Sequence, residues 1–156
     1  MSSLQLFSIR RLTPDDVALM EAMTTMFGEA FDEVDTYTAA RPGTEYLERL
    51  LGAENFIALA ALKGDTVVGG IAAYLLQKFE RERSEIYIYD LAVAAGHRRE
   101  GIATTLIEQL KIIAANLGAY VIFVQADRPD AAAISLYSKK GTCSEVLHFD
   151  FEIAQS

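Results

Sequence analysis

The sequence is poor in cysteine and in positive charge, and each shortage narrows the possibilities. Cys143 is the single cysteine of the 156 residues, so no disulfide can form within the chain, and a reducing compartment is compatible. Fourteen lysines and arginines face 22 carboxylates, and the net charge of -8 disfavours nucleic acid as a partner, since phosphate binding needs a basic face. These acids favour a cationic ligand if they gather near a cleft, although a solvated acidic surface explains them too.

Long apolar runs and metal-binding patterns are also missing. No stretch approaches the ~20 apolar residues of a membrane span, and Met1–Arg11 has neither a long apolar run nor a cleavage site. We therefore expect no signal peptide, no membrane partner and a cytoplasmic location. No histidine, cysteine and carboxylate cluster has ligand spacing, so we expect no metal. Cys143 and His148 lack a third residue to orient a base, which disfavours a thiol nucleophile.

The chain length and the apolar patterns predict one mixed α/β domain over residues 1–156. Half of the residues are hydrophobic, which suits a chain that buries a core. Strand, helix, strand in the second half implies a parallel pair of strands with a right-handed crossover. The expected order is strand 4–10, helix 13–27, irregular acidic segment 28–43, helix 44–51, strands 56–62, 66–76 and 85–93, helix 101–117, strand 120–126, helix 130–140 and strand 145–153.

The turn from His97 to Ala103 has the features of an anion-binding site. It follows an apolar strand and opens a helix, whose first N–H groups have no internal partner and lie at the positive end of the helix dipole. Gly101 and Ala103 allow an anion to approach closely, and Arg98 and Arg99 add positive charge. Neither a Walker loop nor a Rossmann fingerprint is present. The turn predicts pyrophosphate binding, with a surface arginine pair at an ordinary helix start as the alternative.

Asp90 occupies an unusual place in the strand 85–93. Strict alternation puts it on one face with Ile86 and Ile88, where a carboxylate should not lie unpaired. Either a bulge turns Asp90 into a cleft, or the side chain holds a buried hydrogen bond. We expect Asp90 to face a substrate amine as a base or an anchor, with a purely structural role as the alternative.

Two segments together resemble a known family. Leu91-Ala92-Val93 followed by Arg98-x-x-Gly101-x-Ala103 is similar to the [Arg/Gln]-x-x-Gly-x-[Gly/Ala] acetyl-CoA signature of the GCN5-related N-acetyltransferases (GNAT). The run 133–141 resembles the family's Ala-x-x-Leu-Tyr-x-Lys-x-Gly helix. More narrowly, the runs 56–61, 84–93, 118–122 and 148–150 resemble the aminoglycoside 3-N-acetyltransferases of that superfamily.

The resemblance implies the GNAT fold, a central mixed sheet flanked by helices, and acetyl-CoA as cosubstrate. It implies that the pyrophosphate lies on backbone N–H groups and that the pantetheine arm pairs with the strand edge at residues 91–93. It also implies that this edge separates from residues 124–126. Tyr137 would donate a proton to the sulfur, and the N–H of Val93 would stabilise the oxyanion. The expected cosubstrate-binding residues are Leu91, Ala92, Val93, Arg98, Arg99, Glu100, Gly101, Ile102, Ala103, Thr104 and Tyr137.

The acids outside that turn are the candidates for the amine. Asp90 is the expected catalytic base, and Glu85, acting through water, is the alternative. Asp127 follows a strand at its usual ligand-binding end, and Asp150 lies in one of the resembling runs. The expected substrate-binding residues are Tyr89, Asp90, Asp127, Asp150, Glu33 and Asp35, the last two lying in a segment that either covers the substrate or is a solvated connector.

The leading hypothesis is an enzyme that acetylates the 3-amino group of aminoglycosides by direct attack in a ternary complex, which would confer antibiotic resistance. One alternative is an acetyltransferase of a polyamine, a protein lysine or a protein N-terminus, since acidic charge suits those substrates too. Another is a non-catalytic acyl-CoA-binding regulatory module. A homodimer that pairs the last strand antiparallel is compatible with the pattern.

Overall fold

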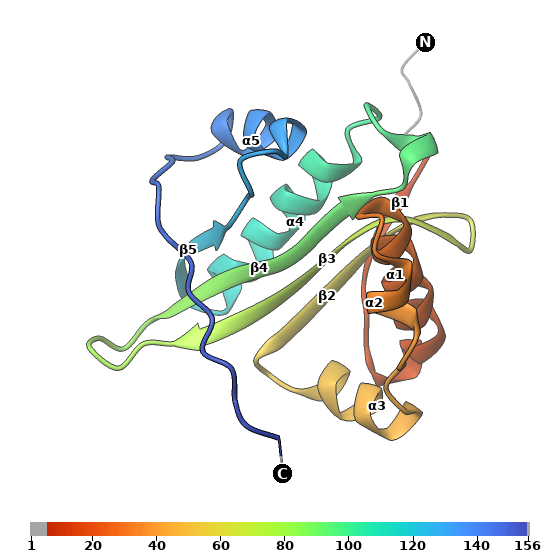
Figure 1. The fold of residues 1–156 in the computed structure, drawn as a ribbon, viewed down its shortest axis with the longest axis horizontal. Coiled ribbons are helices and arrows are strands. Elements are labelled where there is room, and N and C mark those ends of the chain that lie inside the picture. The colour runs from red at the N-terminus through yellow and green to blue at the C-terminus, as the bar shows by residue number, and fades with distance from the viewer. Residues whose placement is uncertain (1–5, 156) are drawn as a thin grey trace. The chain divides into compact units, whose positions relative to one another are not determined.

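The computed structural model describes residues 6–155, and its strands form a five-stranded sheet (Figure 1). The strands lie side by side in chain order, antiparallel except for the last pair, which is parallel. The predicted mixed sheet and its parallel pair are therefore confirmed. The strands are β1 (Ser8–Arg11), β2 (Phe56–Lys63), β3 (Thr66–Gln77), β4 (Ser84–Val93) and β5 (Ala119–Val124).

The helices begin and end at residues with a recognisable local role. Thr13 accepts a hydrogen bond from the backbone of Asp15, and the Asp16 carboxylate accepts one from the Thr13 backbone (2.8 Å), so a capping box opens the 3-10 turn that leads directly into the first helix. Gly118, at φ +75°, follows the end of the long fourth helix, which the sequence places at residue 117. The helices are α1 (Val17–Ala30), α2 (Val34–Thr38), α3 (Thr44–Gly52), α4 (Ile102–Asn116) and α5 (Ala131–Ser138), with short 3-10 turns at Pro14–Asp16 and Ala95–His97.

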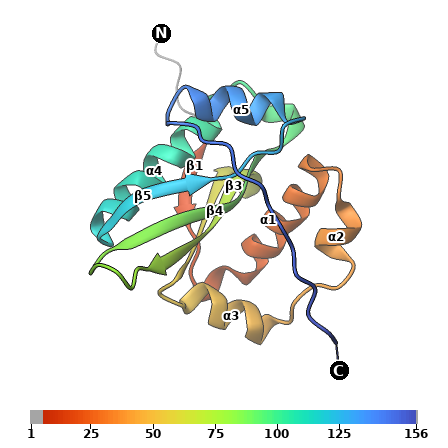
Figure 2. The same ribbon diagram turned by 60° about the vertical axis from the view of Figure 1, so that its left-hand side comes forward.

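Helices cover both faces of the sheet (Figure 2), and a separate apolar cluster lies under the helices on each face. On one face, α1 and α3 supply Met23, Phe27 and Leu47, which pack against small side chains of β2 and β3. On the other face, Leu106 and Leu110 of α4 pack against isoleucines of the sheet. The side of the sheet on which a β4 side chain emerges therefore decides which helices it meets.

The segment 28–43 is more ordered than we predicted. The first helix runs on to Ala30, and α2 follows after a turn in which Asp32 has φ +56°. Gly28 is the physical reason, because a Cβ there would lie 3.1 Å from the Cβ of Tyr37. The missing side chain lets α2 pack closely on α1, so Gly28 marks a close helix contact.

The predicted strand 145–153 is wrong. No strand forms there, and Leu147, Phe149 and Phe151 are at least 72% exposed. Alternating apolar residues become a strand only when a sheet edge satisfies their backbone groups, and none pairs with this segment within residues 6–155. Of the first predicted strand, Leu4 and Gln5 lie outside the described residues.

The chain divides into two compact units, one ending at Gln125 and the other beginning at Ala126. The first unit contains the sheet and both apolar clusters, and the second contains α5. A single domain over residues 1–156 stays a prediction. Within residues 6–155, no helix has both the length and the apolar character that crossing a membrane requires.

Candidate active site

A bulge in β4 lies at Tyr89. Asp90 pairs with Ala72 of β3 and Ile88 pairs with Ala73, so two successive residues of β3 oppose three of β4. Tyr89 is the extra residue and projects into solvent with 64% of its surface exposed. Bulges of this kind bend a strand and redirect the side chains that follow them.

The bulge moves Asp90 to the face of the sheet that carries α1 and α2. Ile86 and Ile88 precede it in the cluster under α4, and Leu91 and Val93 rejoin that cluster after it. Ile88 and Leu91 lie on the same face although they are three positions apart, whereas strict alternation puts residues an odd number of positions apart on opposite faces. The alternation is therefore interrupted between them. Asp90 is thus kept off the isoleucine face by a bulge, which was one of the two alternatives that we offered.

The Asp90 carboxylate also makes the hydrogen bond that we offered as the other possibility. The hydroxyl of Tyr37 on α2 donates to Oδ2 of Asp90 at 3.0 Å. Burial raises the pKa of Asp90 above its ordinary value, the charge of Glu33 adds to the rise, and the Tyr37 hydrogen bond opposes it. Burial and the Asp90 charge likewise raise the pKa of Tyr37. Asp90 is therefore a half-buried carboxylate that is more easily protonated than an ordinary aspartate.

A row of aromatic rings runs across the same face beside Asp90. Neighbouring rings lie 5.2 Å apart for Phe56 and Tyr74, 6.1 Å for Tyr74 and Tyr89, 5.8 Å for Tyr89 and Tyr87, and 4.8 Å for Tyr87 and Phe123. Burial raises the pKa of both Tyr74 and Tyr87, and the Asp90 charge adds to the rise in each. The rings offer faces on which a cation or an apolar ring can rest.

Strands β4 and β5 part where we predicted. Their parallel pairing ends at Ile88 and Val124, while β4 continues to Val93 and stays paired with β3 on its other edge. Within residues 6–155, the β4 edge from Tyr89 to Val93 therefore has no strand partner on the β5 side. Unpaired ladder groups of this kind can bind an extended ligand.

The turn after β4 presents free N–H groups. Arg99 and Gly101 have positive φ angles of +64° and +81°, and α4 begins directly after them. The first hydrogen bond between successive turns of α4 runs from the N–H of Thr105 to the carbonyl of Gly101 (3.0 Å). The N–H groups of residues 102–104 precede this bond and have no helical acceptor, so they can bind an anion.

Side-chain contacts connect the turn between β4 and α4 to the neighbouring strands β2 and β4. Glu100 pairs with Lys63 at the end of β2 and lies 3.4 Å from Nδ1 of His97, and the Lys63 hydrogen bond lowers the pKa of Glu100. Arg98 donates from Nε to the Val93 carbonyl at 3.5 Å. A hollow of about 110 Å³ separates the turn from the end of α1 and is lined by Met26, Glu29, Ala30, Ala94, Ala95 and Arg98.

Glu85 lies far from Asp90. Asp90 follows Glu85 by five positions of β4, about 16 Å at the usual rise of a strand. Tyr120 donates to Glu85 at 2.6 Å and Lys78 lies 3.4 Å away, and these contacts, the Tyr120 hydrogen bond first, lower the pKa of Glu85. The structure does not bring the two candidate bases together.

The two acids of the segment 28–43 differ in their surroundings. Glu33 is close enough to Asp90 and Tyr37 for its charge to raise the pKa of both. Asp35, on α2, is exposed and makes no side-chain hydrogen bond or ion pair within the described part of the chain. Of these two acids, Glu33 is the one whose charge acts on Asp90.

The second unit carries the remaining candidates. Burial, with a contribution from the charge of Asp130, raises the pKa of Tyr137 on α5 to about 12. Asp127 is exposed at the start of this unit, and its carbonyl accepts the N–H of Asp130 at 2.9 Å. Asp150 pairs with His148 at 2.8 Å.

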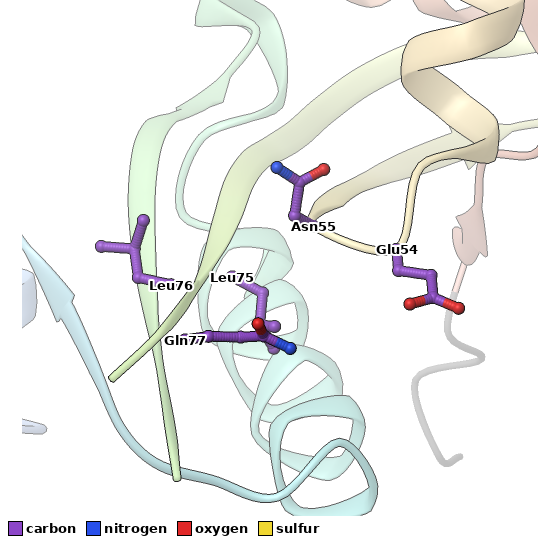
Figure 3. A pocket seen from close by; sticks show the side chains of 5 residues that line it. All are labelled: Glu54, Asn55, Leu75, Leu76 and Gln77. Atoms are coloured by element: carbon purple, nitrogen blue, oxygen red, sulfur yellow. The ribbon is translucent and has the colours of Figure 1, made fainter. Parts of the chain in front are cut away.

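A separate hollow of about 530 Å³ lies at the far end of β3 (Figure 3). It is lined by Glu54, Asn55, Leu75, Leu76 and Gln77, and Gln77 pairs with Ser84 at the end of β4 opposite Val93. None of these residues was a candidate. Within residues 6–155, no group of three or more histidines, cysteines and carboxylates is arranged to hold a metal ion.

The structure adds residues that we did not predict. Tyr87 could have been found from its alternation with Tyr89 on β4. Tyr37 could not, because the sequence predicts an irregular segment where the short helix α2 carries it. The ring contact of Phe123 with Tyr87 depends on the register of β4 with β5, which no local pattern indicates.

Comparison with known proteins gives consistent matches. Residues 18–141 match the acetyltransferase (GNAT) family. An aminoglycoside acetyltransferase from an uncultured soil metagenomic sample shares 59% sequence identity, and the match covers 95% of this chain and 99% of that chain with a TM-score of 0.93. No curated protein matches the chain.

Two further solved structures extend the comparison. A second aminoglycoside acetyltransferase from an uncultured soil metagenomic sample, solved in complex with sisomicin, shares 32% identity over 96% of this chain and 97% of that chain, with a TM-score of 0.87. A ribosomal-protein-alanine N-acetyltransferase from Brucella melitensis shares 20% identity over 94% of this chain and 99% of that chain, with a TM-score of 0.74. The last likeness concerns the fold alone.

Proposed function

Because the chain belongs to the acetyltransferase (GNAT) family, we propose that it transfers an acetyl group from acetyl-CoA to an amino group of an aminoglycoside. The observation that carries the proposal is the half-buried Asp90 carboxylate, turned by the Tyr89 bulge towards an aromatic face at the point where β4 and β5 part. The relatives at 59% and 32% identity are aminoglycoside acetyltransferases, one of them in complex with sisomicin, which supports the substrate class.

The turn after β4 suits the cosubstrate. The N–H groups of residues 102–104 would bind the pyrophosphate, and Arg98 and Arg99 would add positive charge. The free edge of β4 at Leu91 and Val93 would pair with the pantetheine arm. Bound there, acetyl-CoA supplies an activated acetyl thioester. Glu100, which the sequence pattern included in this set, would contribute by bracing the turn through Lys63.

Three groups of the chain would share the chemistry of transfer. Asp90 would accept a proton from the substrate ammonium, because an amine attacks only when it is neutral. The N–H of Val93 would stabilise the oxyanion, and Tyr137 would protonate the leaving thiolate. Burial raises the pKa of Tyr137 to about 12, so its phenol holds a proton to give at neutral pH. Direct attack by the amine then needs no covalent enzyme intermediate.

The acceptor would lie over the aromatic row beside Asp90. Protonated amines are attracted to tyrosine faces and to carboxylates, and Glu33 adds a second negative charge near Asp90. We further propose that the 3-amino group is acetylated and that the reaction confers antibiotic resistance. This regiochemistry rests on the sequence runs that resemble the aminoglycoside 3-N-acetyltransferases. The cytoplasmic location and a homodimer stay predictions.

Thiol release measures the proposed reaction. The purified protein would be incubated with acetyl-CoA and a panel of aminoglycosides that includes gentamicin and sisomicin, and free CoA would be followed with a thiol reagent. We expect turnover with several drugs, and mass spectrometry and NMR of the product would locate the acetyl group. No release across the panel would exclude the drug-modifying activity. Faster turnover of spermidine or of a lysine peptide would favour the alternative substrates.

A further inference from the structure

We propose that Tyr37 is the positioning residue of the acceptor site, whose hydroxyl holds the Asp90 carboxylate in the orientation from which it takes the proton of the substrate amine. The role of Asp90 as base rests on the proposed function. The link between the two side chains does not, because it is a property of the free protein.

The hydrogen bond joins residues that are 53 positions apart in the chain and fixes one oxygen of the carboxylate. Tyr37 donates to Oδ2, and Oδ1 of Asp90 has no hydrogen-bond partner within residues 6–155. A carboxylate held by one oxygen leaves the other free to face a ligand. Because no cation of the described chain pairs with Asp90, the Tyr37 hydroxyl is the contact that sets its rotation.

Close packing of α2 on α1 places the Tyr37 ring. A Cβ at Gly28 would lie 3.1 Å from the Cβ of Tyr37 and 3.2 Å from the Cα of Val34, so a larger residue would push α2 away. The rings of Phe27 and Phe31 lie 6.3 Å and 5.9 Å from the Tyr37 ring. Contacts of its ring and backbone therefore hold Tyr37 on α1. The hydroxyl can be removed without removing these contacts.

The end of α2 is fastened to α1 as well. The Arg41 guanidinium donates to the carbonyl of Glu21 at 3.1 Å and to the hydroxyl of Thr25. Glu33, just before α2, donates its N–H to the carbonyl of Gly28 at 2.8 Å. With both ends of α2 attached to α1, the Tyr37 hydroxyl is directed at Asp90 by packing rather than by Asp90 itself.

The charges near Asp90 make this hydrogen bond decisive for its protonation. Burial and Glu33 both disfavour the carboxylate form, and the tyrosines 74, 87 and 89 of the same face carry no positive charge. Tyr37 is the neighbour that favours the carboxylate. Without the Tyr37 hydroxyl the pKa of Asp90 must rise. As the pH falls, the Asp90 carboxylate then becomes protonated, and stops acting as a base, at a higher pH than in the wild type.

The test replaces the hydroxyl and keeps the ring. We expect Tyr37→Phe to lower kcat/KM for the aminoglycoside about tenfold at neutral pH, the factor that corresponds to one hydrogen bond to a charged group. The acidic limb of the pH profile should move to higher pH, while KM for acetyl-CoA stays unchanged. Thr38→Val is the matched control, since it removes another hydroxyl of α2, whose partner within residues 6–155 is the carbonyl of Val34.

A titration of the free protein measures the link without turnover. NMR of carboxyl-labelled aspartate, with the Asp90 signal assigned by Asp90→Asn, should show a higher pKa of Asp90 in Tyr37→Phe. Gly28→Ala displaces Tyr37 with its hydroxyl intact and should move the same signal in the same direction. An unchanged Asp90 pKa in the Tyr37→Phe protein overturns the inference. If the wild type acetylates no aminoglycoside, the proposed function fails, and the titration still decides the role of Tyr37.

A double variant separates positioning from other effects. Once Asp90 is Asn, removal of the Tyr37 hydroxyl should cause no further loss of kcat, because the group that it positions is gone. An equal loss in both backgrounds would mean that Tyr37 acts by another route.

Discussion

At the scale of the single residue, the proposed role of Asp90 predicts opposite effects of its replacement on stability and on activity. Burial and Glu33 raise its pKa, so the ionised form is disfavoured by folding at neutral pH. We expect Asp90→Asn to raise the melting temperature at pH 7, since the amide is neutral and its oxygen can still accept from Tyr37. The same change should lower kcat on the order of a hundredfold, as loss of a general base does.

The gain in stability expected from Asp90→Asn should increase with pH. A carboxyl whose folded pKa is raised binds more protons folded than unfolded, so its contribution to stability falls as the pH rises through the interval above its ordinary value of 3.8. The advantage of Asp90→Asn should therefore shrink as the pH is lowered towards that value. Melting curves of both proteins over this range check it. A variant that is less stable than the wild type at pH 7 would contradict the sign.

Tyr137 is the second residue with a specific expectation. Burial raises its pKa to about 12, so the phenol keeps its proton throughout the working range and can donate it to a thiolate. We expect Tyr137→Phe to lower kcat on the order of a hundredfold with little change in KM for acetyl-CoA. In the wild type, kcat should not decline at mildly alkaline pH through this group. A variant with the wild-type kcat would exclude Tyr137 as the proton donor.

At the scale of the element, the turn that opens α4 depends on backbone conformation. Gly101 has φ +81°, yet a Cβ there would meet nothing within 4 Å, so a substitution is strained by the dihedral angle alone. We expect Gly101→Ala to raise KM for acetyl-CoA roughly tenfold, in line with a left-handed penalty of about 1–2 kcal/mol. Saturating acetyl-CoA should restore most of kcat.

Gly96 is the matched control for that prediction. It lies just before the same turn and also has open space around its Cβ position, but its φ lies outside the left-handed region. Gly96→Ala should therefore leave KM for acetyl-CoA unchanged. Equal increases in both variants would show that the turn is sensitive to any side chain and not to the dihedral angle of Gly101.

Elements differed in how far local patterns predicted them. The helix that ends before Gly118, and the two strands that flank the turn at Gly64 (φ +60°), followed from residues close together in the chain. Helix α2 did not, because five residues are too few for a periodic signal and its stability comes from packing on Gly28. The strand 145–153 was predicted wrongly because alternation shows a capacity to pair and not the presence of a partner.

At the scale of the whole molecule, net charge should govern the encounter with the drug. A chain of charge -8 attracts a polycationic aminoglycoside, and salt screens that attraction. Raising the ionic strength from about 0.01 M to about 1 M shortens the screening length from about 30 Å to about 3 Å. We expect kcat/KM for the aminoglycoside to fall on the order of tenfold over this range.

Acetyl-CoA provides the internal control for the salt experiment. It is an anion, so an acidic protein gives it no long-range attraction that salt could remove. Its kcat/KM should not fall in parallel with that of the aminoglycoside. A parallel fall for both substrates would point to a general effect of salt on the enzyme and contradict steering by net charge.

The sequence by itself determined the order of most elements, the turn from His97 to Ala103 and the class of reaction, because caps, glycine turns and motifs act between residues close in the chain. Tertiary structure decided where the Asp90 side chain lies and which group it contacts. The Tyr89 bulge exists only in the register of β4 on β3, and the Tyr37 hydroxyl reaches Asp90 across 53 positions only because α2 packs on α1. Both depend on long-range pairing and packing, which no run of neighbouring residues encodes.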